Sequence, residues 1–424
     1  MPRKLHEGVS PAWPLATIAI PTHRDFDDIS VTQHAARALT SYDIHATEAG
    51  VETFVVPGSL PVFAPPAFPL SLPPDAPTPA VAEAFPRCPL EPLLRALAIT
   101  APDVDPASFD VVTDRRNLRL LLDFATDRTR EFRLNAQIVD GTLLLARWID
   151  WEQRAATVVG AGKNWEHACT RRRGEQLAHK RAVGYSLGGL RMCVSSMINA
   201  RLPGDDDDDD DDDASGKEEG DGDERAAPEA TITPTGHRLI RAGSFAPQSV
   251  MVQIKSCSQR ASQRVVLSRA LPQMWFSRTQ QLCTGQHING GVFVSLALAD
   301  LDADGAFADW QRDNSGHLKT LVKTLYELKT TLTRLALPSD ACATFAVICR
   351  TGRGTGVATK LQVYGLARDY GFGLPDDLVD ALRGTRDSAA APAADADAAL
   401  HAAMEKLDLR EPSVPLRRGL KRAP

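Results

Sequence analysis

At 424 residues the chain is long enough for two or three average domains, and its formal net charge is −6. The charge is uneven, because residues 205–225 hold 14 acidic and 2 basic residues and leave the rest of the chain at +6. A modestly basic body suits an anionic partner but does not by itself indicate nucleic acid. No apolar run approaches the roughly 20 residues that span a bilayer, and no apolar stretch follows residues 1–4, so we expect a soluble intracellular protein, nuclear or cytoplasmic, without a membrane partner.

The seven cysteines favour reduced thiols over a disulfide framework. Their number is odd, they are scattered along the chain, and no two of them have the C-x-x-C spacing. We therefore predict free thiols that lie mostly in the hydrophobic core.

Three segments of biased composition set the predicted domain limits. Residues 56–80 carry a proline every few residues, which fixes φ and removes backbone donors, so we predict an extended linker there. Residues 203–236 are acidic and almost free of large apolar side chains, so we predict a disordered insert. The predicted organisation is an N-terminal segment, a Pro-rich linker, an α+β domain that contains the insert, and a mobile tail with a basic end (1–55, 56–84, 85–383 and 384–424).

A helix is predicted to begin after Asp114. The side chain of Asp114 can accept backbone donors of the first turn, and apolar residues then recur at helical spacing (Leu118, Leu121, Leu122 and Ala125). A hairpin is predicted next. Its strands are residues 132–139 and 142–148, joined by Asp140–Gly141, a turn whose positive φ angles match the twist of paired strands.

Helices and strands are predicted to interleave through the rest of the domain. The predicted helices are residues 165–176, 265–281 and 317–335, and the last is the most clearly amphipathic. The predicted strands are residues 190–200, 249–257, 282–287, 292–298, 343–350 and 359–364. This order predicts an α+β fold, with a mixed and largely antiparallel sheet on which the helices pack.

The aspartate run Asp205–Asp213 resembles the metal-binding motif of prenyl diphosphate synthases such as geranylgeranyl pyrophosphate synthetase. Those enzymes need two D-D-x-x-D motifs on facing helices of an all-α bundle, where the carboxylates converge on shared magnesium ions. This chain has a single homopolymer in a segment predicted to be disordered, and the rest of the domain is rich in predicted strands. We therefore interpret the run as a solvated acidic loop.

The segment Gly184–Gly188 reads G-Y-S-L-G and matches the nucleophile elbow of α/β-hydrolases, with Ser186 as the nucleophile. An elbow lies between a buried strand and a helix. Residues 176–181 look unlike a buried strand, and the residues that follow the motif look like a strand rather than a helix. A serine esterase is therefore a minor alternative.

Two further motifs are incomplete. Residues 300–305 copy the first half of an EF-hand loop, but the twelfth position is Gln311 instead of a bidentate glutamate, so we predict a polar turn that caps a helix. Gly160–Lys163 lacks the later glycine of a dinucleotide-binding loop and the Ser/Thr of a phosphate-binding loop. We predict a turn there as well.

Five segments between about residues 85 and 300 together resemble the DXO-type decapping and RNA 5′-end-processing nucleases, as a divergent, fungal-type member. Each segment is a weak match alone, and the resemblance depends on their order, spacing and predicted element type. The first two segments are an arginine before a leucine-rich helix (112–121) and a glycine–aromatic–glutamate motif (162–166). The next two stand in the places of the family's Glu-x-Asp strand (194–199) and Glu-x-Lys strand (252–256). The last is the end of a tryptophan-to-glutamine helix (275–278).

The resemblance implies a PD-(D/E)xK-like nuclease fold with a magnesium-dependent site. It places Glu166 and Lys255 at retained catalytic positions and leaves Glu166 as a single weak metal ligand. Residues two apart on a strand face the same way, so Met197 and Asn199 are expected to project together, as are Gln253 and Lys255. Magnesium prefers hard, charged oxygen ligands.

The sequence departs from the family pattern at most of these positions. The substituted positions are Met197 for Glu, Asn199 for Asp, Gln253 for Glu and Arg278 for Gln. By the resemblance, a pocket with four negative and two positive charges becomes one with one negative and three positive charges. Repulsion then disfavours a divalent cation and favours an anion.

These substitutions suggest a metal-poor, cationic pocket with no cofactor. We hypothesise that it binds a phosphate, such as an RNA or nucleotide 5′ end, through Arg115, Lys255 and Arg278 without cutting it. An active magnesium-dependent phosphodiesterase is the alternative, and it would need carboxylates from Asp123, Asp140 or the acidic insert.

Two roles remain open for the charged segments. A protein-interaction module could use the acidic tract or the basic tail to dock a partner. The acidic tract could also compete with RNA for the pocket as a tethered polyanion.

Overall fold

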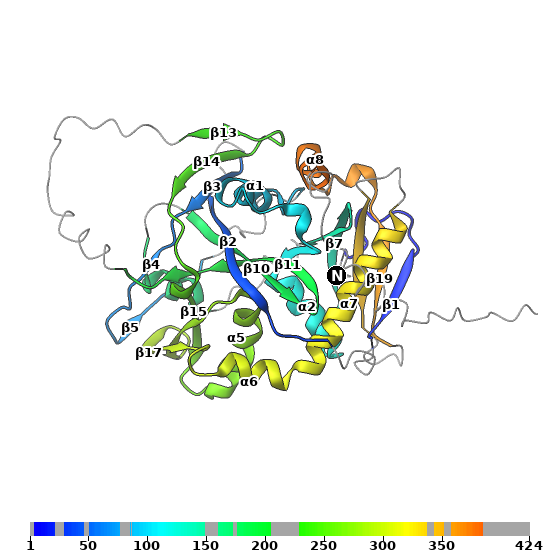
Figure 1. The fold of residues 1–424 in the computed structure, drawn as a ribbon. Coiled ribbons are helices and arrows are strands. Elements are labelled where there is room, and N and C mark those ends of the chain that lie inside the picture. The colour runs from blue at the N-terminus through cyan, green and yellow to red at the C-terminus, as the bar shows by residue number, and fades with distance from the viewer. Residues whose placement is uncertain are drawn as a thin grey trace, which may run out of the picture. The chain divides into compact units, whose positions relative to one another are not determined.

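Two β-sheets form the framework of the fold (Figure 1). The order of the twelve-stranded sheet is β1 (Ala16–Ala19), β19 (Lys360–Gly365), β18 (Thr344–Arg350), β7 (Phe132–Val139), β8 (Thr142–Arg147), β6 (Val111–Asp114), β11 (Leu190–Ile198), β10 (Gln176–Leu187), β2 (His34–His45), β3 (Thr53–Gly58), β14 (Arg238–Gly243) and β13 (Ala230–Ile232). The order of the seven-stranded sheet is β5 (Leu70–Ser71), β17 (Val292–Asp300), β16 (Gln281–Ile288), β15 (Met251–Ser258), β12 (Ala200–Arg201), β4 (Val62–Phe63) and β9 (Thr170–Arg171).

The computed structural model describes the chain in ten segments: residues 4–21, 29–45, 51–76, 85, 87–148, 160–172, 176–204, 229–336, 343–351 and 358–384. The helices in these segments are α1 (Glu91–Thr100), α2 (Arg115–Ala125), α4 (Gly162–Ala168), α5 (Gln263–Ser277), α6 (Ala306–Asp313), α7 (Ser315–Leu335) and α8 (Asp376–Gly384), with short 3₁₀ turns η3 (Pro106–Ser108), η5 (Gln248–Val250) and η6 (Arg368–Tyr370). Both sheets are mixed and largely antiparallel, which confirms the predicted α+β class.

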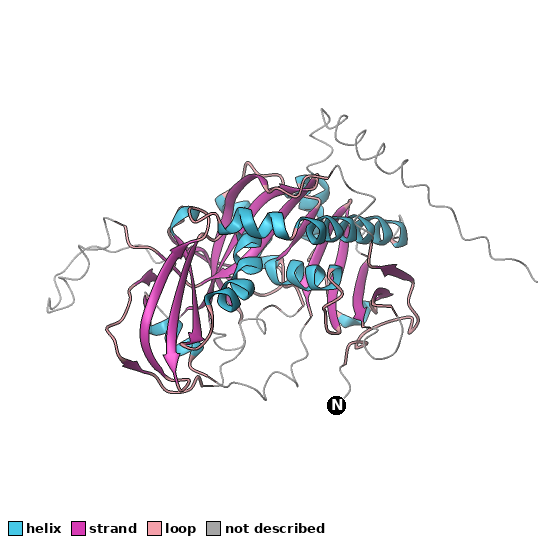
Figure 2. Ribbon diagram, turned by 90° about the horizontal axis from the view of Figure 1, so that it is seen from below, coloured by secondary structure: helices cyan, strands magenta, loops and turns pink. Residues whose placement is uncertain are grey.

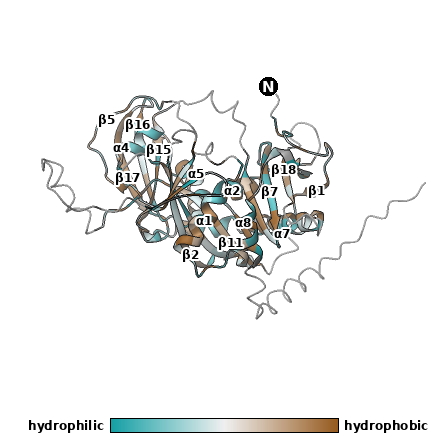
Figure 3. Cartoon of the chain, turned by 90° about the horizontal axis from the view of Figure 1, so that it is seen from above, coloured by the Kyte–Doolittle hydropathy of each residue, from teal (hydrophilic) through white to brown (hydrophobic). Residues whose placement is uncertain are grey.

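Helices cover both faces of the larger sheet. On one face α2, α5 and α7 bury apolar side chains against the strands, among them Leu118, Trp275 and Leu325. On the other face α1 and α8 pack over a second apolar cluster that contains Leu97 and Val379. Figure 2 shows α7 lying across the strands, and Figure 3 shows hydrophobic stretches in the elements of these layers. The predicted amphipathic helix 317–335 is therefore confirmed as α7.

Helix α2 begins as its sequence predicts. Oδ1 of Asp114 accepts the backbone N–H groups of Arg116 and Asn117 at 2.9 and 3.0 Å, which satisfies two of the donors that a helix start leaves unpaired. Asp114 also ends β6, the strand beside β11, so the cap fixes the point at which the chain leaves the sheet and enters α2.

Replacing Asp114 by alanine is expected to lower the free energy of unfolding by roughly 0.5–2 kcal/mol, the usual value of an N-cap. Urea denaturation followed by circular dichroism measures this change. Asp114→Asn is the control, because asparagine caps equally well without the charge. An equal loss in both variants would show that the charge, and not the cap, is responsible.

The predicted helix 165–176 is wrong beyond Ala168. Helix α4 ends there, Thr170–Arg171 forms β9, and residues from Gln176 form the long strand β10. Strand β10 lies between β2 and β11 and pairs with both over most of its length. This pairing outweighs the local preference of residues 176–181, which on their own do not look like a buried strand.

The predicted N-terminal segment and Pro-rich linker differ from the structure in their described parts. Strands β1, β2 and β3 belong to the larger sheet, and β4 and β5 belong to the smaller one. The apolar residues between the prolines are buried, including Phe54, Val56 and Val62. Pro61 and Pro69 directly precede β4 and β5, where a missing N–H costs no ladder hydrogen bond. Burial of the apolar residues therefore decides the structure of this segment.

The acidic insert is only partly within the described residues. Residues 205–228, which include Asp205–Asp213, lie outside them, as does the tail beyond residue 384. Residues 229–236 were predicted to be disordered. Instead they form β13 and a turn closed by a hydrogen bond from Thr233 N–H to the carbonyl of His237.

The cysteine prediction holds for the part of the chain that is described. All six cysteines there are free, and Cys169, Cys193, Cys283 and Cys349 are buried. Cys342 lies outside the described residues. Among the helices that are described, none is both long and apolar enough to cross a membrane.

Candidate functional site

Helix α4 carries Glu166 and is fixed at both its start and its middle. The carboxylate of Asp75 accepts the N–H groups of Lys163 and Asn164 at 2.9 Å each, and so caps the first turn. Trp165 is fully buried, stacks on Phe293 at 4.2 Å, and donates its indole N–H to the carbonyl of Lys255 at 3.0 Å. These contacts bind the helix to β15 and β17, and they place Glu166 next to the strand that carries Lys255.

Lys255 and Gln253 lie two residues apart on β15 and alternate with buried apolar residues. Lys255 is half-buried. Burial and the charges of Arg115 and Arg119 together lower its pKa to about 8, while Glu166 acts in the opposite direction. The ammonium group therefore lies in a positively charged, poorly solvated environment.

Arg115 is the first residue of α2 and lies in the same environment. Its Nη1 donates to Oγ of Ser277 at the end of α5, at 3.3 Å. Burial lowers its pKa to about 10, and Arg119, one turn further along α2, also lowers it, whereas Asp114 and Glu166 raise it. The sequence analysis missed Arg119, although its i+4 spacing from Arg115 puts both residues on one helix face.

Glu166 is the carboxylate at the centre of this group. Burial raises its pKa, and Lys255, Lys163 and Arg172 oppose that rise by their positive charges. Arg172 follows β9 and donates to the carbonyl of Gln176 at 3.2 Å. No pattern in the sequence pointed to Arg172, because it lies directly after β9 and outside any helix or strand. The structure thus brings Arg115, Glu166 and Lys255 together and adds Arg119 and Arg172.

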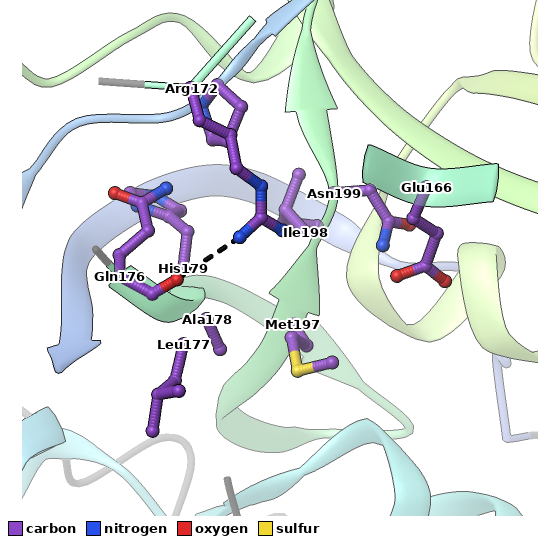
Figure 4. A pocket seen from close by; sticks show the side chains of 10 residues that line it. Glu166, Arg172, Gln176, Leu177, Ala178, His179, Met197, Ile198 and Asn199 are labelled. Carbon is purple, nitrogen blue, oxygen red and sulfur yellow. Dashed lines mark hydrogen bonds between the residues drawn. The ribbon is translucent and has the colours of Figure 1, made fainter. Parts of the chain in front are cut away.

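Two of the substituted positions, Met197 and Asn199, line a small cavity of about 30 Å³ beside Glu166. Its lining residues are Pro61, Glu166, Arg172, Gln176, Leu177, Ala178, His179, Met197, Ile198 and Asn199 (Figure 4). In Figure 4, Glu166 and Asn199 lie to one side of Ile198, and Arg172 and Gln176 lie to the other. The side chain of Met197, on β11, is partly exposed at 40%.

Asn199 and Gln253 form a neutral amide pair. Oδ1 of Asn199 accepts the side-chain amide of Gln253 and the backbone N–H of Ile254, the latter at 2.9 Å. Gln253 is only 2% exposed, and its Oε1 has no hydrogen-bond partner among the described residues. The oxygen of Asn199 is therefore already engaged by protein donors.

These residues do not fit a divalent metal ion. Among the described residues Glu166 is the only carboxylate that lines the cavity, the thioether of Met197 is a soft ligand, and Asn199 accepts two protein hydrogen bonds. The charges of Lys255 and Arg172 also act on Glu166. Within the described ranges no group of three or more His, Cys, Asp or Glu is placed to hold a metal.

Arg278 does not join this group. It occupies the left-handed position that ends α5, and its guanidinium points to Asp302 at 3.8 Å, to Oε1 of Gln33 at 3.5 Å and over the ring of Phe307 at 5.8 Å. Its charge does not contribute to the lowered pKa of Lys255, in contrast to Arg115 and Arg119. We therefore leave Arg278 out of the candidate site.

The G-Y-S-L-G motif is part of a β-hairpin. Ser186 lies within strand β10, contrary to the prediction, but β11 comes next, and Gly188 and Gly189 form the turn with φ of 58° and 86°. A nucleophile elbow requires a helix at that point. The hairpin therefore excludes the elbow geometry.

The EF-hand-like segment is a polar turn, as predicted, but α6 begins after Gly305 without the predicted side-chain cap. Oδ1 of Asp300 accepts the N–H groups of Asp302 and Ala303 at 3.0 Å each, and Oδ2 of Asp302 accepts the side chain of Gln280. Helix α6 begins directly after Gly305. Gly160–Lys163 likewise forms the bend and first residues of α4.

Solved structures of Rai1 proteins share the fold at low sequence identity. The Schizosaccharomyces pombe Rai1 structure matches at TM-score 0.52 and 11% identity, over 82% of this chain and 98% of that chain. Candida albicans Rai1, solved with pU5 and Mn²⁺, matches at TM-score 0.53 and 11% identity, over 84% and 95%. Scheffersomyces stipitis Rai1, solved with (3′-NADP)⁺ and a calcium ion, matches at TM-score 0.50 and 12% identity, over 81% and 92%.

These matches show the DXO-type fold that the five segments predicted. No curated protein is similar in sequence. A family model described as "Domain of unknown function (DUF8563)" matches residues 21–364, which is most of the chain, and the protein therefore belongs to that family.

Proposed function

We propose that this domain binds RNA 5′ ends, or other terminal phosphate groups, without metal-dependent cleavage. The ligand would bind at a basic cluster that consists of Arg115, Arg119, Arg172 and Lys255. The observation that carries the proposal is the number of basic side chains around Glu166: Lys255, Lys163 and Arg172 act on its charge, and Arg115 and Arg119 act with it on Lys255. Among the described residues, none of the four side chains of the cluster forms an ion pair within 4 Å.

Unpaired basic groups in a half-buried site favour an anionic ligand. Burial lowers the pKa of Arg115, Lys255 and Arg172, which means that the nearby carboxylates only partly compensate each charged form in the free protein. A phosphate would supply that compensation through short, charge-assisted hydrogen bonds. Arginine suits it best, because its planar guanidinium can donate two parallel hydrogen bonds to a phosphate.

The nature of the ligand is supported by the shared fold. The Candida albicans Rai1 structure contains pU5 with Mn²⁺, so this architecture can hold a uridine oligonucleotide with its phosphates. The metal does not transfer with the fold, because Met197, Asn199 and Gln253 offer no carboxylate here. In this chain the basic side chains of the cluster remain, and they would bind the phosphate.

Binding of a 5′-phosphorylated oligouridine RNA is expected to be the same in EDTA and in millimolar Mg²⁺ or Mn²⁺. Fluorescence anisotropy measures the affinity, and gel electrophoresis of the same samples checks that the RNA stays intact. The affinity should fall with salt, with a slope of about −0.7 per phosphate contacted in the plot of log K against log[salt]. Binding that requires the metal, or shortening of the RNA, would contradict the proposal and favour an active phosphodiesterase.

A further inference from the structure

The smaller sheet has an open face that begins at Lys255 of the basic cluster. Directly paired residues of neighbouring strands share a face, so Lys255 lies in one row with Thr284 and Ala297. The next row on the same face consists of Cys257, Gln286 and Ser295. We call these six residues the open face. Ala297 is exposed and the other five residues are half-buried.

Helices lie on both sides of this sheet, but they leave the open face partly uncovered. Trp165 of α4 packs against Gly285, which faces the opposite way from Thr284 and Gln286. On the side of the open face, Leu282 is buried in the apolar cluster that contains the C-terminal half of α5. The N-terminal half of α5 is largely exposed, and Figures 1 and 3 show this helix beside β15. Helix α5 therefore borders the open face.

This part of the chain carries positive charge without any acidic residue. Residues 230–299, which contain β15, α5, β16 and nearly all of β17, hold seven Lys and Arg and no Asp or Glu. Among the described residues that form the strands of the smaller sheet, Asp300 is the only acidic one, and its carboxylate accepts the side chain of Gln281 at 2.7 Å. The open face is therefore complementary to an anionic partner.

Three arginines at the start of α5 supply exposed positive charge at the border of the open face. Arg260 lies two residues beyond β15, and Arg264 and Arg269 lie in the exposed half of the helix. Among the described residues none of the three forms an ion pair within 4 Å. Arginines beside a neutral polar surface fit a chain of phosphates, because the guanidinium donates to phosphate oxygens in pairs.

We propose that an RNA strand whose 5′ phosphate occupies the basic cluster continues over the open face, with later phosphates at Arg260, Arg264 and Arg269. The inference rests on the proposed function and adds the class of ligand, a single-stranded RNA of several nucleotides in preference to a mononucleotide. The hydroxyl and amide groups of the open face suit a polar chain, because they can both donate and accept hydrogen bonds. The open face has no aromatic ring on which a base could stack, so little preference for base sequence is expected.

The experiment compares a long and a short ligand on each protein. The probes are 5′-phosphorylated decauridine and uridine 5′-monophosphate, titrated by calorimetry in EDTA. The unchanged protein should bind the decamer about tenfold more tightly or better, the effect of a few exposed charge contacts. The slope of log K against log[salt] should be steeper for the decamer by about 2, because three further phosphates contribute about 0.7 each. Since both ligands meet the same preparation, an unfolded fraction cancels from the ratio of affinities.

Replacing Arg260, Arg264 and Arg269 together by glutamine should bring the ratio close to one and remove the difference in slope. The affinity for uridine 5′-monophosphate should be unchanged. The matched control replaces by glutamine three exposed arginines that lie just beyond α2 and in the last turn of α7 (Arg128, Arg130 and Arg334). It removes the same charge from the protein and should leave the ratio as it is.

A second pair of variants tests the open face itself. Ala297→Asp places a carboxylate on the open face, two strands away from Lys255, and should lower the ratio because it repels the phosphates of the strand. Leu298→Asp is the control, because Leu298 is the next residue of β17, is 44% exposed and faces the opposite way. The same charge on that side should leave the ratio unchanged.

The outcomes separate this inference from the proposed function. If uridine 5′-monophosphate binds as tightly as the decamer, or if the ratio survives the loss of the three arginines, the path over the open face is wrong and the phosphate site stands. Equal effects of Ala297→Asp and Leu298→Asp would also overturn the path, because general repulsion would explain both. If an oligo-aspartate peptide displaces the decamer as well as free decamer does, the assignment to RNA fails. If neither nucleotide ligand binds, the proposed function fails and the inference with it.

Discussion

Replacing Lys255 by methionine is expected to weaken the binding of 5′-phosphorylated RNA by about 10- to 150-fold. This range corresponds to the roughly 1.5–3 kcal/mol of a hydrogen bond to a charged group. Methionine keeps most of the length and apolar stem of the side chain, so the packing of β15 against α4 should persist. Lys360→Met, which removes the same charge from β19, is the control and should leave binding unchanged.

The pH dependence identifies Lys255 as the group responsible. Because burial and Arg115 lower its pKa to about 8, the ammonium form dominates below that pH and is lost above it. A terminal phosphate is already a dianion above pH 7, since its second pKa is about 6. Binding should therefore decrease as the pH rises above 8, with a midpoint at or above that value because a bound phosphate stabilises the ammonium.

Lys255→Arg provides the comparison, since arginine stays charged over this range. Its binding should be nearly constant between pH 7 and 9. A parallel decrease in this variant would assign the titration to another group, and no decrease in the unchanged protein would remove Lys255 from the phosphate site.

Truncating Trp165 to alanine is expected to lower the free energy of unfolding by about 3–5 kcal/mol. The indole is fully buried, stacks on Phe293 and donates to the carbonyl of Lys255. It also fills the space beside Gly285, where an added Cβ would lie 2.2 Å from the ring. The variant loses all of these contacts at once, and it leaves a cavity between α4 and the smaller sheet.

Urea denaturation measures this loss, and Phe68→Ala is the control. Phe68 also contacts Trp165 but is 37% exposed, so its truncation should cost far less. Trp165→Phe should have an intermediate effect, because it keeps an aromatic ring but not the indole N–H. A cost below about 1 kcal/mol for Trp165→Ala would mean that α4 is not held by this side chain.

The role of Trp165 links stability to the candidate site. The same side chain fixes the helix that carries Glu166 and donates to the carbonyl of Lys255. The position of Glu166 beside the basic cluster therefore depends on the buried apolar contact of Trp165, and not on ion pairs. This is consistent with a site that keeps its basic groups unpaired until a ligand binds.

The sequence by itself determined the elements that depend on local interactions. The cap at Asp114, the apolar face of α7 and the turn at Asp140–Gly141 were all predictable, and Asn289–Gly290 carries the same turn signal. The two hairpin turns have the positive φ angles that their residues favour, 44° and 81° in the first and 51° and 80° in the second. Each signal lies within a few residues of the element it specifies, so no knowledge of distant contacts is needed.

The sequence also identified part of the candidate site. Arg115, Glu166 and Lys255 were chosen through the resemblance to DXO-type nucleases, and the structure brings them together. Their roles in phosphate binding remain proposals. The fold itself was predicted because the five segments depend on order and spacing, which survive at 11% identity.

Only the tertiary structure decided the remaining features. Strands β3 to β5 form in spite of their prolines because their apolar residues are buried in the two sheets, and β10 forms because two strands flank it. Arg278 lies outside the group because its guanidinium contacts Asp302 and the ring of Phe307. Asp43 and His179 are 136 residues apart, and their pairing follows from the register of β2 and β10. Such contacts depend on chain segments that meet only in the folded protein, so no local pattern can encode them.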